Sequence, residues 1–243
     1  MSYISKHISE CISGFYPIII SDYNSYYNLN QINVVFNYGS SDTSYNLESK
    51  EIIFIKSIEI KTSVGLNFYN LRKLYYGNSS VIALIGDCNY LFYKSKFNQD
   101  ISTWDVSNVT NMSYMFSGSQ FNQDISQWDV SSVINMKGMF YRSKFNQYIN
   151  RWNTSSVTDM DYMFYHSCFN QDISTWDTSS VTTMESMFKY SKFNQDISSW
   201  NVSKVIDMSS MFYHSEFNQD ISAWNVSGLI YMDYMFRDPK FNQ

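Results

Sequence analysis

The 243-residue sequence predicts an α/β solenoid, a ladder of 24-residue coils that each hold a strand and a helix, with a small α+β cap at its N-terminal end. Three observations predict this fold. Phe-Asn-Gln recurs every 24 residues from Phe97 to Phe241, apolar residues keep fixed places within each period, and residues 1–70 lack the repeat. A fixed period of this length is typical of solenoids, in which each unit buries its apolar face against its neighbours.

The cap is expected in residues 1–70. Isoleucine at every fourth position predicts a short amphipathic helix within residues 2–13. Apolar or alternating runs predict three strands, at residues 16–20, 32–38 and 51–61, the last with a slip in its alternation near Ser57. Such a region would cover the open end of the repeat array.

The solenoid is expected in residues 71–243. Counting back 24 residues from the apolar positions of the first clear repeat reaches apolar residues at every step, so residues 73–96 are predicted to form a degenerate first coil. Six full repeats then span residues 97–240, and residues 241–243 begin another.

Each repeat is predicted to fold as a strand followed by a helix. Apolar residues at the first, fourth and sixth positions of Ile101–Val106 predict a short strand with Trp104 and Val106 facing inward. The apolar residues that follow are Val109, Met112, Met115 and Phe116, and their spacing predicts a helix over residues 109–116. Ser107 precedes this helix, where its hydroxyl could cap backbone N–H groups.

The repeat FNQDIS-x-W-[DN]-[VT]-S-x-V-x-x-M-x-x-MF, present over residues 97–243, resembles the BspA-like leucine-rich-repeat superfamily. The repeat resembles the mycoplasma-type variant of unknown function within that superfamily, and similar arrays are also found in large DNA viruses. The resemblance implies a leucine-rich-repeat-like fold and a binding or adhesion module without enzymatic activity. The sequence lacks the signal peptide and lipobox of the bacterial members, which favours a viral or intracellular role.

Charge and composition narrow the expected partners. The net charge is −5, and residues 97–243 hold nine basic and fifteen acidic residues, so neither nucleic acid nor an anionic membrane is expected as a partner. The three cysteines form no CxxC pair, which favours a reducing compartment. Without a signal peptide or a long apolar segment, the host cytoplasm or a virion is the expected location, in preference to a cell surface.

The sequence predicts no enzyme, no cofactor and no metal site. His166 and His214 share a repeat position but lie two coils apart, about 10 Å by strand spacing. Cys168 is close to His166, but a metal site needs three or four such ligands. There is no G-x-S-x-G, no phosphate-binding glycine loop and no HExxH motif.

Stacked repeats turn each position into a column of side chains about 4.8 Å apart. The Phe, Ile, Trp, Val and Met columns are predicted to form the core. The Asn98 column is either a polar binding stripe or an amide ladder that satisfies backbone groups, and the ladder is favoured. Asp100 and its equivalents are predicted to close turns rather than bind calcium. The Tyr114 and Tyr141 columns could either contact a partner or cover the core.

The predicted partner-binding residues flank the inward-facing pair of each strand and would face out from the concave side of a parallel sheet. They are Thr103, Asp105, Gln127, Asp129, Arg151, Asn153, Thr175, Asp177, Ser199, Asn201 and Asn225. The expected function is a non-catalytic scaffold that binds a protein. One alternative is a self-assembling structural or virion-associated protein, joined end to end through an uncapped C-terminal coil. The other is a cell-surface adhesin.

Overall fold

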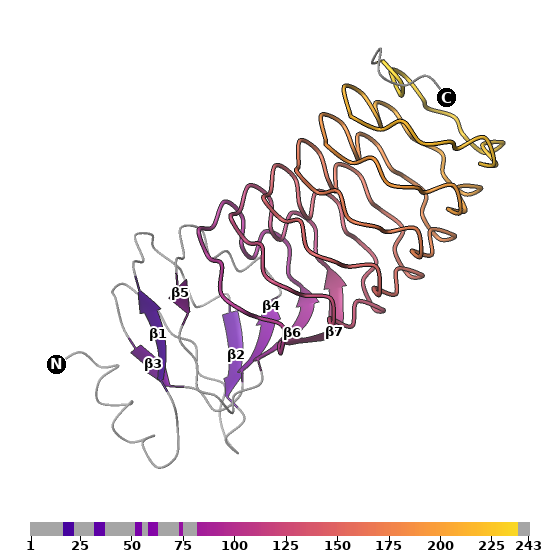
Figure 1. Ribbon diagram of the computed structural model, residues 1–243. Coiled ribbons are helices and arrows are strands. Elements are labelled where there is room, and N and C mark those ends of the chain that lie inside the picture. Colours follow the sequence, from indigo (N-terminus) through magenta and orange to yellow (C-terminus); the bar gives the residue numbers. More distant parts are fainter. Residues whose placement is uncertain are drawn as a thin grey trace.

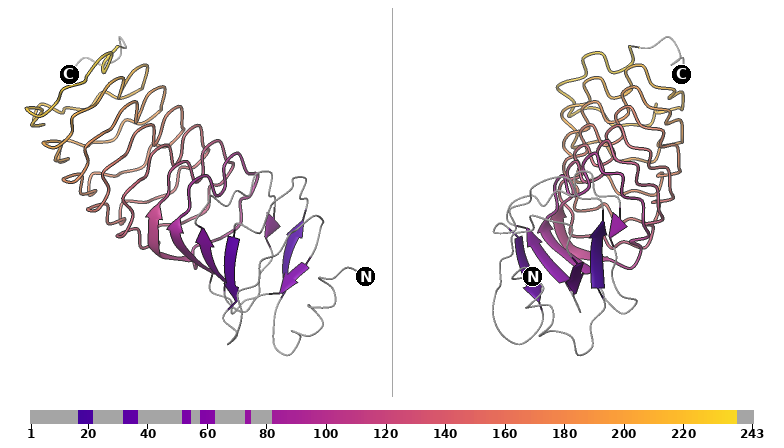
Figure 2. Two further views of the ribbon diagram at one scale, coloured as in Figure 1. Left: turned by 180° about the vertical axis from the view of Figure 1, so that it is seen from behind. Right: turned by 90° about the vertical axis from the view of Figure 1, so that its left-hand side faces the viewer.

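The computed structural model describes residues 17–21, 32–36, 52–54, 58–62, 73–74 and 82–237 (Figure 1). From residue 82 to residue 237 the chain winds into successive coils stacked along one axis, which the views from behind and from the side also show (Figure 2). The predicted solenoid is therefore confirmed. The helix predicted within residues 2–13 lies outside the described residues, which contain no helix that could cross a membrane.

In the part of the chain that the structure describes, seven strands form two sheets. The strands are β1 (Pro17–Ser21), β2 (Ile32–Phe36), β3 (Ile52–Phe54), β4 (Ile58–Thr62), β5 (Lys73–Leu74), β6 (Ile82–Asp87) and β7 (Asp105–Asn111). One sheet has the order β3-β1-β5 and the other β2-β4-β6-β7. The three predicted strand runs contain or overlap β1 to β4, and the slip near Ser57 falls between β3 and β4.

The second sheet leads into the solenoid. β2 pairs with β4 antiparallel, whereas β4 with β6 and β6 with β7 are parallel. Beyond β7 the parallel pairing narrows to single bridges between neighbouring coils, from Asn111↔Asn135 to Asp207↔Tyr231. The strand predicted around Trp104 and Val106 is therefore present only as β7, which begins after Trp104, and as the equivalent β6 in the degenerate first coil. In later coils the equivalent residues lie in turns and connecting backbone.

The predicted helix over residues 109–116 is wrong, and the described residues contain no helix at all. Tyr114 and Gly118 have φ values of 54° and 65°, and these two left-handed positions recur in later coils. Residues with positive φ four apart cannot continue an α-helix. The methionine and phenylalanine spacing buries the same side chains in successive turns as it would in a helix, so the apolar pattern alone could not distinguish them.

Hydrogen bonds between coils replace those of the expected helix. The N–H groups of Met112 and Tyr114 donate to the carbonyls of Asn135 and Lys137 in the next coil, at 2.9 and 2.7 Å. The intervening N–H groups close tight turns, as Met115 N does on Met112 O at 3.1 Å. Alternate N–H groups thus serve neighbouring coils and local turns, and both sets are satisfied.

Side-chain oxygens close up to four turns in a coil. In the coil that begins near Phe121, the acceptors are Ser119 Oγ, Asp124 Oδ1, Asp129 Oδ1 and Asn135 Oδ1. Each accepts the N–H two residues later, at 2.8 to 3.3 Å. Ser, Asp and Asn favour such local bonds over regular helix or sheet, which explains why a coil rich in these residues is built from turns.

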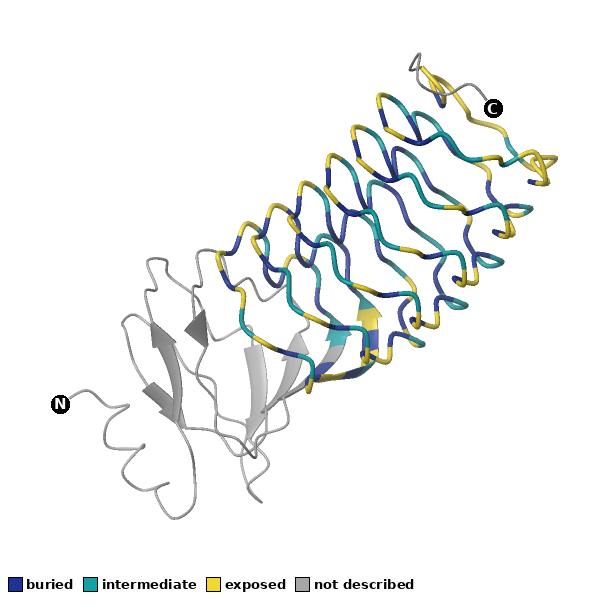
Figure 3. Cartoon of the chain, viewed as in Figure 1, coloured by how far each residue is buried: buried dark blue, intermediate teal, exposed yellow. Residues whose placement is uncertain are grey.

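The core columns fill the inside of the solenoid, where buried positions alternate with exposed ones along each coil (Figure 3). Trp152 is buried, stacks on Trp176 with ring centroids 6.3 Å apart, and donates its Nε1–H to Ile125 O of the preceding coil at 3.0 Å. Phe140 and Phe164 stack at 5.7 Å. The prediction that these columns are core is confirmed.

The asparagine column is an amide ladder. Asn146 N donates to Asn122 Oδ1 at 2.8 Å, and Asn170 N donates to Asn146 Oδ1 at 2.9 Å. Gln171 Nε2 also donates to Asn146 Oδ1, at 3.2 Å. These side chains satisfy backbone groups of the next coil, which confirms the structural interpretation of the Phe-Asn-Gln motif.

Candidate functional site

The eleven predicted partner-binding residues, here called the turn strip, are all exposed. They lie on the turns beside each tryptophan rather than on a parallel sheet, and only Asp105 belongs to a strand. The predicted location on a sheet is wrong because the parallel bridges run through the Asn135 position, on the segment expected to be helical. Stacked turns still repeat the strip from coil to coil.

Six of the eleven turn-strip residues, the Asp and Asn column, have a structural role. Asp105 Oδ1 accepts the Ser107 N–H at 3.0 Å and the Ser107 hydroxyl at 2.7 Å. Asn153 Oδ1 accepts the equivalent bonds from Ser155 at 3.2 and 2.7 Å. A carboxylate and an amide both supply this oxygen, which explains why Asp and Asn alternate here. Folding therefore requires an oxygen acceptor at these positions, but it does not require a charge.

The other five turn-strip residues, in the Thr103 column, vary more. The Thr103 column reads Thr, Gln, Arg, Thr, Ser and Ala along the solenoid. Thr175 Oγ1 donates to Asn150 O at 2.5 Å, and Ser199 Oγ donates to Ser174 O at 2.8 Å. Gln127 and Arg151 project from the same turn with larger, exposed side chains. This column carries the greatest chemical variety on a backbone that hardly changes.

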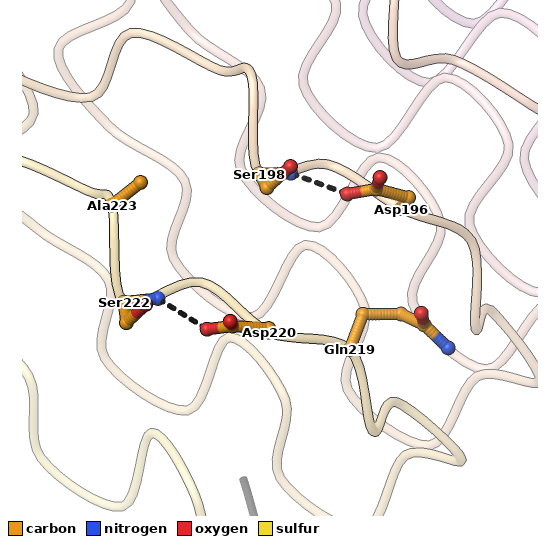
Figure 4. A pocket seen from close by; sticks show the side chains of 6 residues that line it. All are labelled: Asp196, Ser198, Gln219, Asp220, Ser222 and Ala223. Carbon is orange, nitrogen blue, oxygen red and sulfur yellow. Dashed lines mark hydrogen bonds between the residues drawn. The ribbon is translucent and has the colours of Figure 1, made fainter.

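A pocket of about 290 Å³ opens between two turns of neighbouring coils, one closed by Asp196 and the other by Asp220 (Figure 4). Asp196 accepts the Ser198 N–H at 2.9 Å, and Asp220 accepts the Ser222 N–H at 2.8 Å. Backbone and side-chain hydrogen bonds from these serines lower the pKa of both aspartates. In the part of the chain that the structure describes, no three His, Cys, Asp or Glu side chains are grouped to hold a metal ion.

A charged cluster that the sequence analysis missed crosses three coils. Lys137 Nζ lies 3.1 Å from Asp161 Oδ2, and Asp161 Oδ1 accepts the Glu185 N–H at 2.8 Å. Thr183 also donates to Asp161, and Tyr162 donates to Glu185. Thr183 replaces the Asn or Asp that closes the turn in neighbouring coils, and Asp161 of the preceding coil supplies the missing acceptor. The threonine in a column of Asn and Asp is the feature of the sequence that could have revealed this cluster.

Burial shapes the protonation of this cluster. Burial raises the pKa of Asp159, although the Asp161 N–H acts in the opposite direction and the Asp161 charge adds to the rise. Burial would lower the pKa of Lys137, but its hydrogen bond and attraction to Asp161 outweigh this effect and raise it. The groups are used in bonds between coils, so the cluster acts as a clamp within the solenoid.

Tyrosines and cations line another edge, here called the aromatic edge. Tyr141 and Tyr165 stack at 4.6 Å, and the Arg142 guanidinium lies 5.4 Å from the Tyr141 ring. Lys189 Nζ lies 4.6 Å from the Tyr213 ring. These tyrosines are half-buried, so they cover the core and still present their outer edges to solvent.

Comparison with known families finds one match. The model of the family described as Mycoplasma protein of unknown function, DUF285, matches residues 79–168 and 142–243, which together make up more than half of the chain. No curated protein and no solved structure matches the sequence.

Proposed function

We propose a function for this chain, which belongs to the family described as Mycoplasma protein of unknown function, DUF285: it is a non-catalytic scaffold that binds a protein partner along the turn strip. One observation carries the proposal. All eleven turn-strip positions are exposed on turns that side-chain oxygens and bonds between coils hold in register. A partner would meet a surface that needs little ordering, which favours binding.

The two columns of the turn strip would have different roles. The Asp and Asn column supplies a mildly acidic rim whose charge changes from coil to coil. The Thr103 column supplies side chains of different size, such as Gln127 and Arg151, which would select the partner by shape and hydrogen bonding. Solenoids commonly bind through extended surfaces of this kind.

The aspartates of the strip support a non-catalytic role. The Ser131 hydroxyl and N–H lower the pKa of Asp129, and the equivalent groups of Ser179 lower the pKa of Asp177. A general acid needs a pKa near the working pH. These carboxylates are instead ionised turn acceptors.

The test is capture of partners by the full chain and by two matched variants. Asp105→Asn, Asp129→Asn and Asp177→Asn together remove three charges but keep every turn acceptor. Asp124→Asn, Asp172→Asn and Asp220→Asn make the same change outside the strip. We expect the first triple variant to lose a partner that the second retains, scored by quantitative pull-down. Equal retention by both variants would refute the proposed surface.

A relationship to the BspA-like leucine-rich-repeat superfamily is part of the proposal. It is supported by the Ile-x-x-Trp-x-Val spacing, whose Ile and Trp are buried in every coil from 97 to 216, and by the amide ladder. An experimental structure of a bacterial member with the same turn-built coil would support common descent. A strand–helix coil there would argue against it.

A second candidate function, self-association, rests on the last described coil. Ile230, Met232 and Tyr234 are 66%, 65% and 61% exposed, whereas Met208, which occupies the place of Met232 in the preceding coil, is 0% exposed. A second copy could cover these side chains. Analytical ultracentrifugation over rising concentration should then show dimers that Met232→Ser weakens. A strict monomer excludes this candidate.

A further inference from the structure

The aromatic edge runs through three positions of each coil, and these positions hold positive but no negative charge. They are the positions of Tyr114, Ser117 and Gly118 and of their equivalents. In residues 90–237 they hold nine Tyr, four Lys or Arg, two His and no Asp or Glu, and Asp238 follows at one of them outside the described residues. Two residues further on, Glu216 is acidic, but alternate coils carry three exposed cations, Lys96, Lys144 and Lys192. The edge is therefore positive in a chain whose net charge is −5.

Successive coils lie closer together at this edge than on the opposite side of the solenoid. Where rings at equivalent positions of neighbouring coils are parallel, the distance between their centroids gives the local separation of the coils. In the columns of the Phe-Asn-Gln phenylalanine and of the tryptophan, this distance is 6.2 to 6.4 Å. Between Tyr141 and Tyr165 it is 4.6 Å. Between Tyr90 and Tyr114, at another position of the edge, it is 5.0 Å. The solenoid therefore curves, with the aromatic edge on its inner side.

The hydrogen bonds between coils agree with this curvature. At the aromatic edge the backbones bond directly, as Tyr114 N does to Lys137 O at 2.7 Å. Around the tryptophan column side chains bridge the coils instead, as Trp152 Nε1 does to Ile125 O at 3.0 Å. The turn strip flanks the tryptophans, so it lies on the outer side. Concave surfaces are the ones on which side chains from several coils can converge on one partner.

The cations of the edge are ordered before any partner binds. The Arg142 guanidinium lies 5.4 Å from the Tyr141 ring and 5.8 Å from the Tyr165 ring. Lys189 Nζ lies 4.6 Å from the Tyr213 ring. Attraction to the rings holds both charges over the edge. Side chains that are already ordered lose less entropy on binding, which raises affinity.

The carboxylates beside the edge in the middle coils belong to the clamp. Asp161 stands one position before the edge, and it is buried and paired with Lys137 at 3.1 Å. Glu185 stands at the equivalent position of the next coil and accepts the Tyr162 hydroxyl, which fixes that ring. Neither is bonded to a cation of the edge. Arg142 and Lys189 form no ion pair with a described residue.

The edge presents ring edges, hydroxyls and cations, and few open ring faces. Tyr141 and Tyr165 cover each other, and Arg142 lies over both rings. Bases of single-stranded nucleic acid stack on open ring faces, which this arrangement withholds. Tyr190 is exposed beside Lys189, so an apolar contact and a positive charge are offered together. Tyrosine and arginine on an ordered surface are typical of protein interfaces.

We propose that the aromatic edge is a second protein-binding surface, and that it binds a protein segment in which carboxylates are mixed with apolar side chains. The carboxylates would pair with Arg142 and Lys189, and the apolar side chains would contact exposed tyrosines such as Tyr190. The edge is on the inner side and the turn strip on the outer side. Failure of this proposal therefore leaves the proposed function of the turn strip unaffected, and each has its own variants.

The test uses the full chain and three labelled peptides. One has five Glu-Leu-Ser units, the second replaces every Glu by Gln, and the third replaces every Leu by Ser. Fluorescence anisotropy should give the Glu-Leu-Ser peptide a Kd at least tenfold tighter than that of either other peptide. Loss of charge removes the ion pairs in the second peptide, and loss of leucine removes the apolar contacts in the third.

Two pairs of variants assign the binding to the edge. Lys189→Glu should weaken binding of the Glu-Leu-Ser peptide at least tenfold, whereas Lys204→Glu should change it less than twofold, because Lys204 is exposed in another column. Tyr190→Ser should weaken it at least threefold, whereas Tyr148→Ser should change it less than twofold, since Tyr148 is exposed away from the edge.

Four outcomes would overturn the proposal. Equal binding of the three peptides, or no binding at millimolar concentration, would show that the edge does not recognise this chemistry. Equal loss within each pair of variants would show non-specific attraction. Tighter binding of a deoxythymidine oligonucleotide or of phosphatidylserine vesicles would assign the edge to that partner instead.

Discussion

Tryptophan lies inside every full coil, whereas lysine lies outside every second one. Trp152 fills a buried volume, stacks on Trp176 and donates to the Ile125 carbonyl, so packing and a hydrogen bond both constrain this position. The position of Lys144 requires only a backbone that can turn, and Gln120 and Cys168 occupy it in neighbouring coils. The fold repeats every 24 residues, whereas these lysines repeat every 48. The longer period is therefore a property of the surface and not of the fold.

The contrast predicts that the cost of substitution falls from the inner columns to the outer ones. Inner columns combine packing with a hydrogen bond, the amide ladder has hydrogen bonds without deep burial, and the turn acceptors have a single exposed bond. The predictions below follow that order.

Trp152→Ala should have the largest effect. Removing a buried indole from the middle of the stack should lower the free energy of unfolding by about 3–5 kcal/mol. Urea denaturation followed by circular dichroism would measure it, with Tyr148→Ala as the control because Tyr148 is 64% exposed. If the two variants lost similar stability, the inner column would not be the more constrained one.

Asn146→Ala should have the next largest effect. It removes the acceptor of the Asn170 N–H and of Gln171 Nε2, which leaves part-buried donors unpaired at about 1–3 kcal/mol. Asn146→Asp keeps the same oxygen and should retain more stability in the same urea titration. An equal loss would assign the effect to the amide NH₂ instead of the ladder.

Asp129→Ala should cost about 1 kcal/mol, because it removes one turn acceptor at the surface. Asp129→Asn should cost less than Asp129→Ala at pH 7, because an amide oxygen keeps the turn acceptor, as Asn153 does in the next coil, and only the contribution of the charge is lost. The pKa of Asp129 is lowered, so the stability from its charge is present above about pH 4 and lost as pH falls through the folded-state pKa. Asp129→Asn should remove that acid-sensitive part. An acid titration of the two variants that ran parallel to the parent protein would contradict this.

The sequence predicted those features that repeat, and missed those that depend on backbone φ or on single coils. The period, the core columns and the amide ladder all follow from identical residues at identical intervals. The helix was wrong because residues such as Met112 and Phe116 are buried equally well by consecutive turns, and only the positive φ at Tyr114 separates the two. Tyrosine gives no signal for that conformation.

The candidate site divides in the same way. The exposure of turn-strip residues such as Gln127 and Arg151 was predictable, because they flank a buried tryptophan. The Asx turns beneath the strip could not be predicted from an expected strand. The Lys137–Asp161 clamp was missed for a different reason: its signal, Thr183, is a single departure from the repeat, and a column analysis discounts single departures.

A substitution at Asp159 should have the smallest effect on the free energy of unfolding, and it tests whether folding constrains the charge in an outer column. Its oxygen closes a turn by accepting the Asp161 N–H at 2.9 Å, a role that Asn111 and Asn135 perform in earlier coils. Burial raises the pKa of Asp159, so its ionised form is less favourable in the folded chain than in the unfolded one. The contribution of Asp159 to stability should therefore be greatest below about pH 4 and decline as pH rises through its folded-state pKa.

Asp159→Asn keeps the acceptor and removes the charge, so it should stabilise the chain at pH 7 by a few tenths of a kcal/mol, since solvent screens this half-exposed group. At pH 3 the gain should vanish, because the parent carboxyl is then protonated. Asp207→Asn is the matched control: Asp207 bonds the Ser209 N–H at 2.8 Å in the same column, but a serine stands where Asp161 stands beside Asp159. Urea titrations at both pH values would measure the difference. A gain at pH 7 for both variants would mean that every charge in this column opposes folding, and that the outer columns are more constrained than their mixed composition indicates.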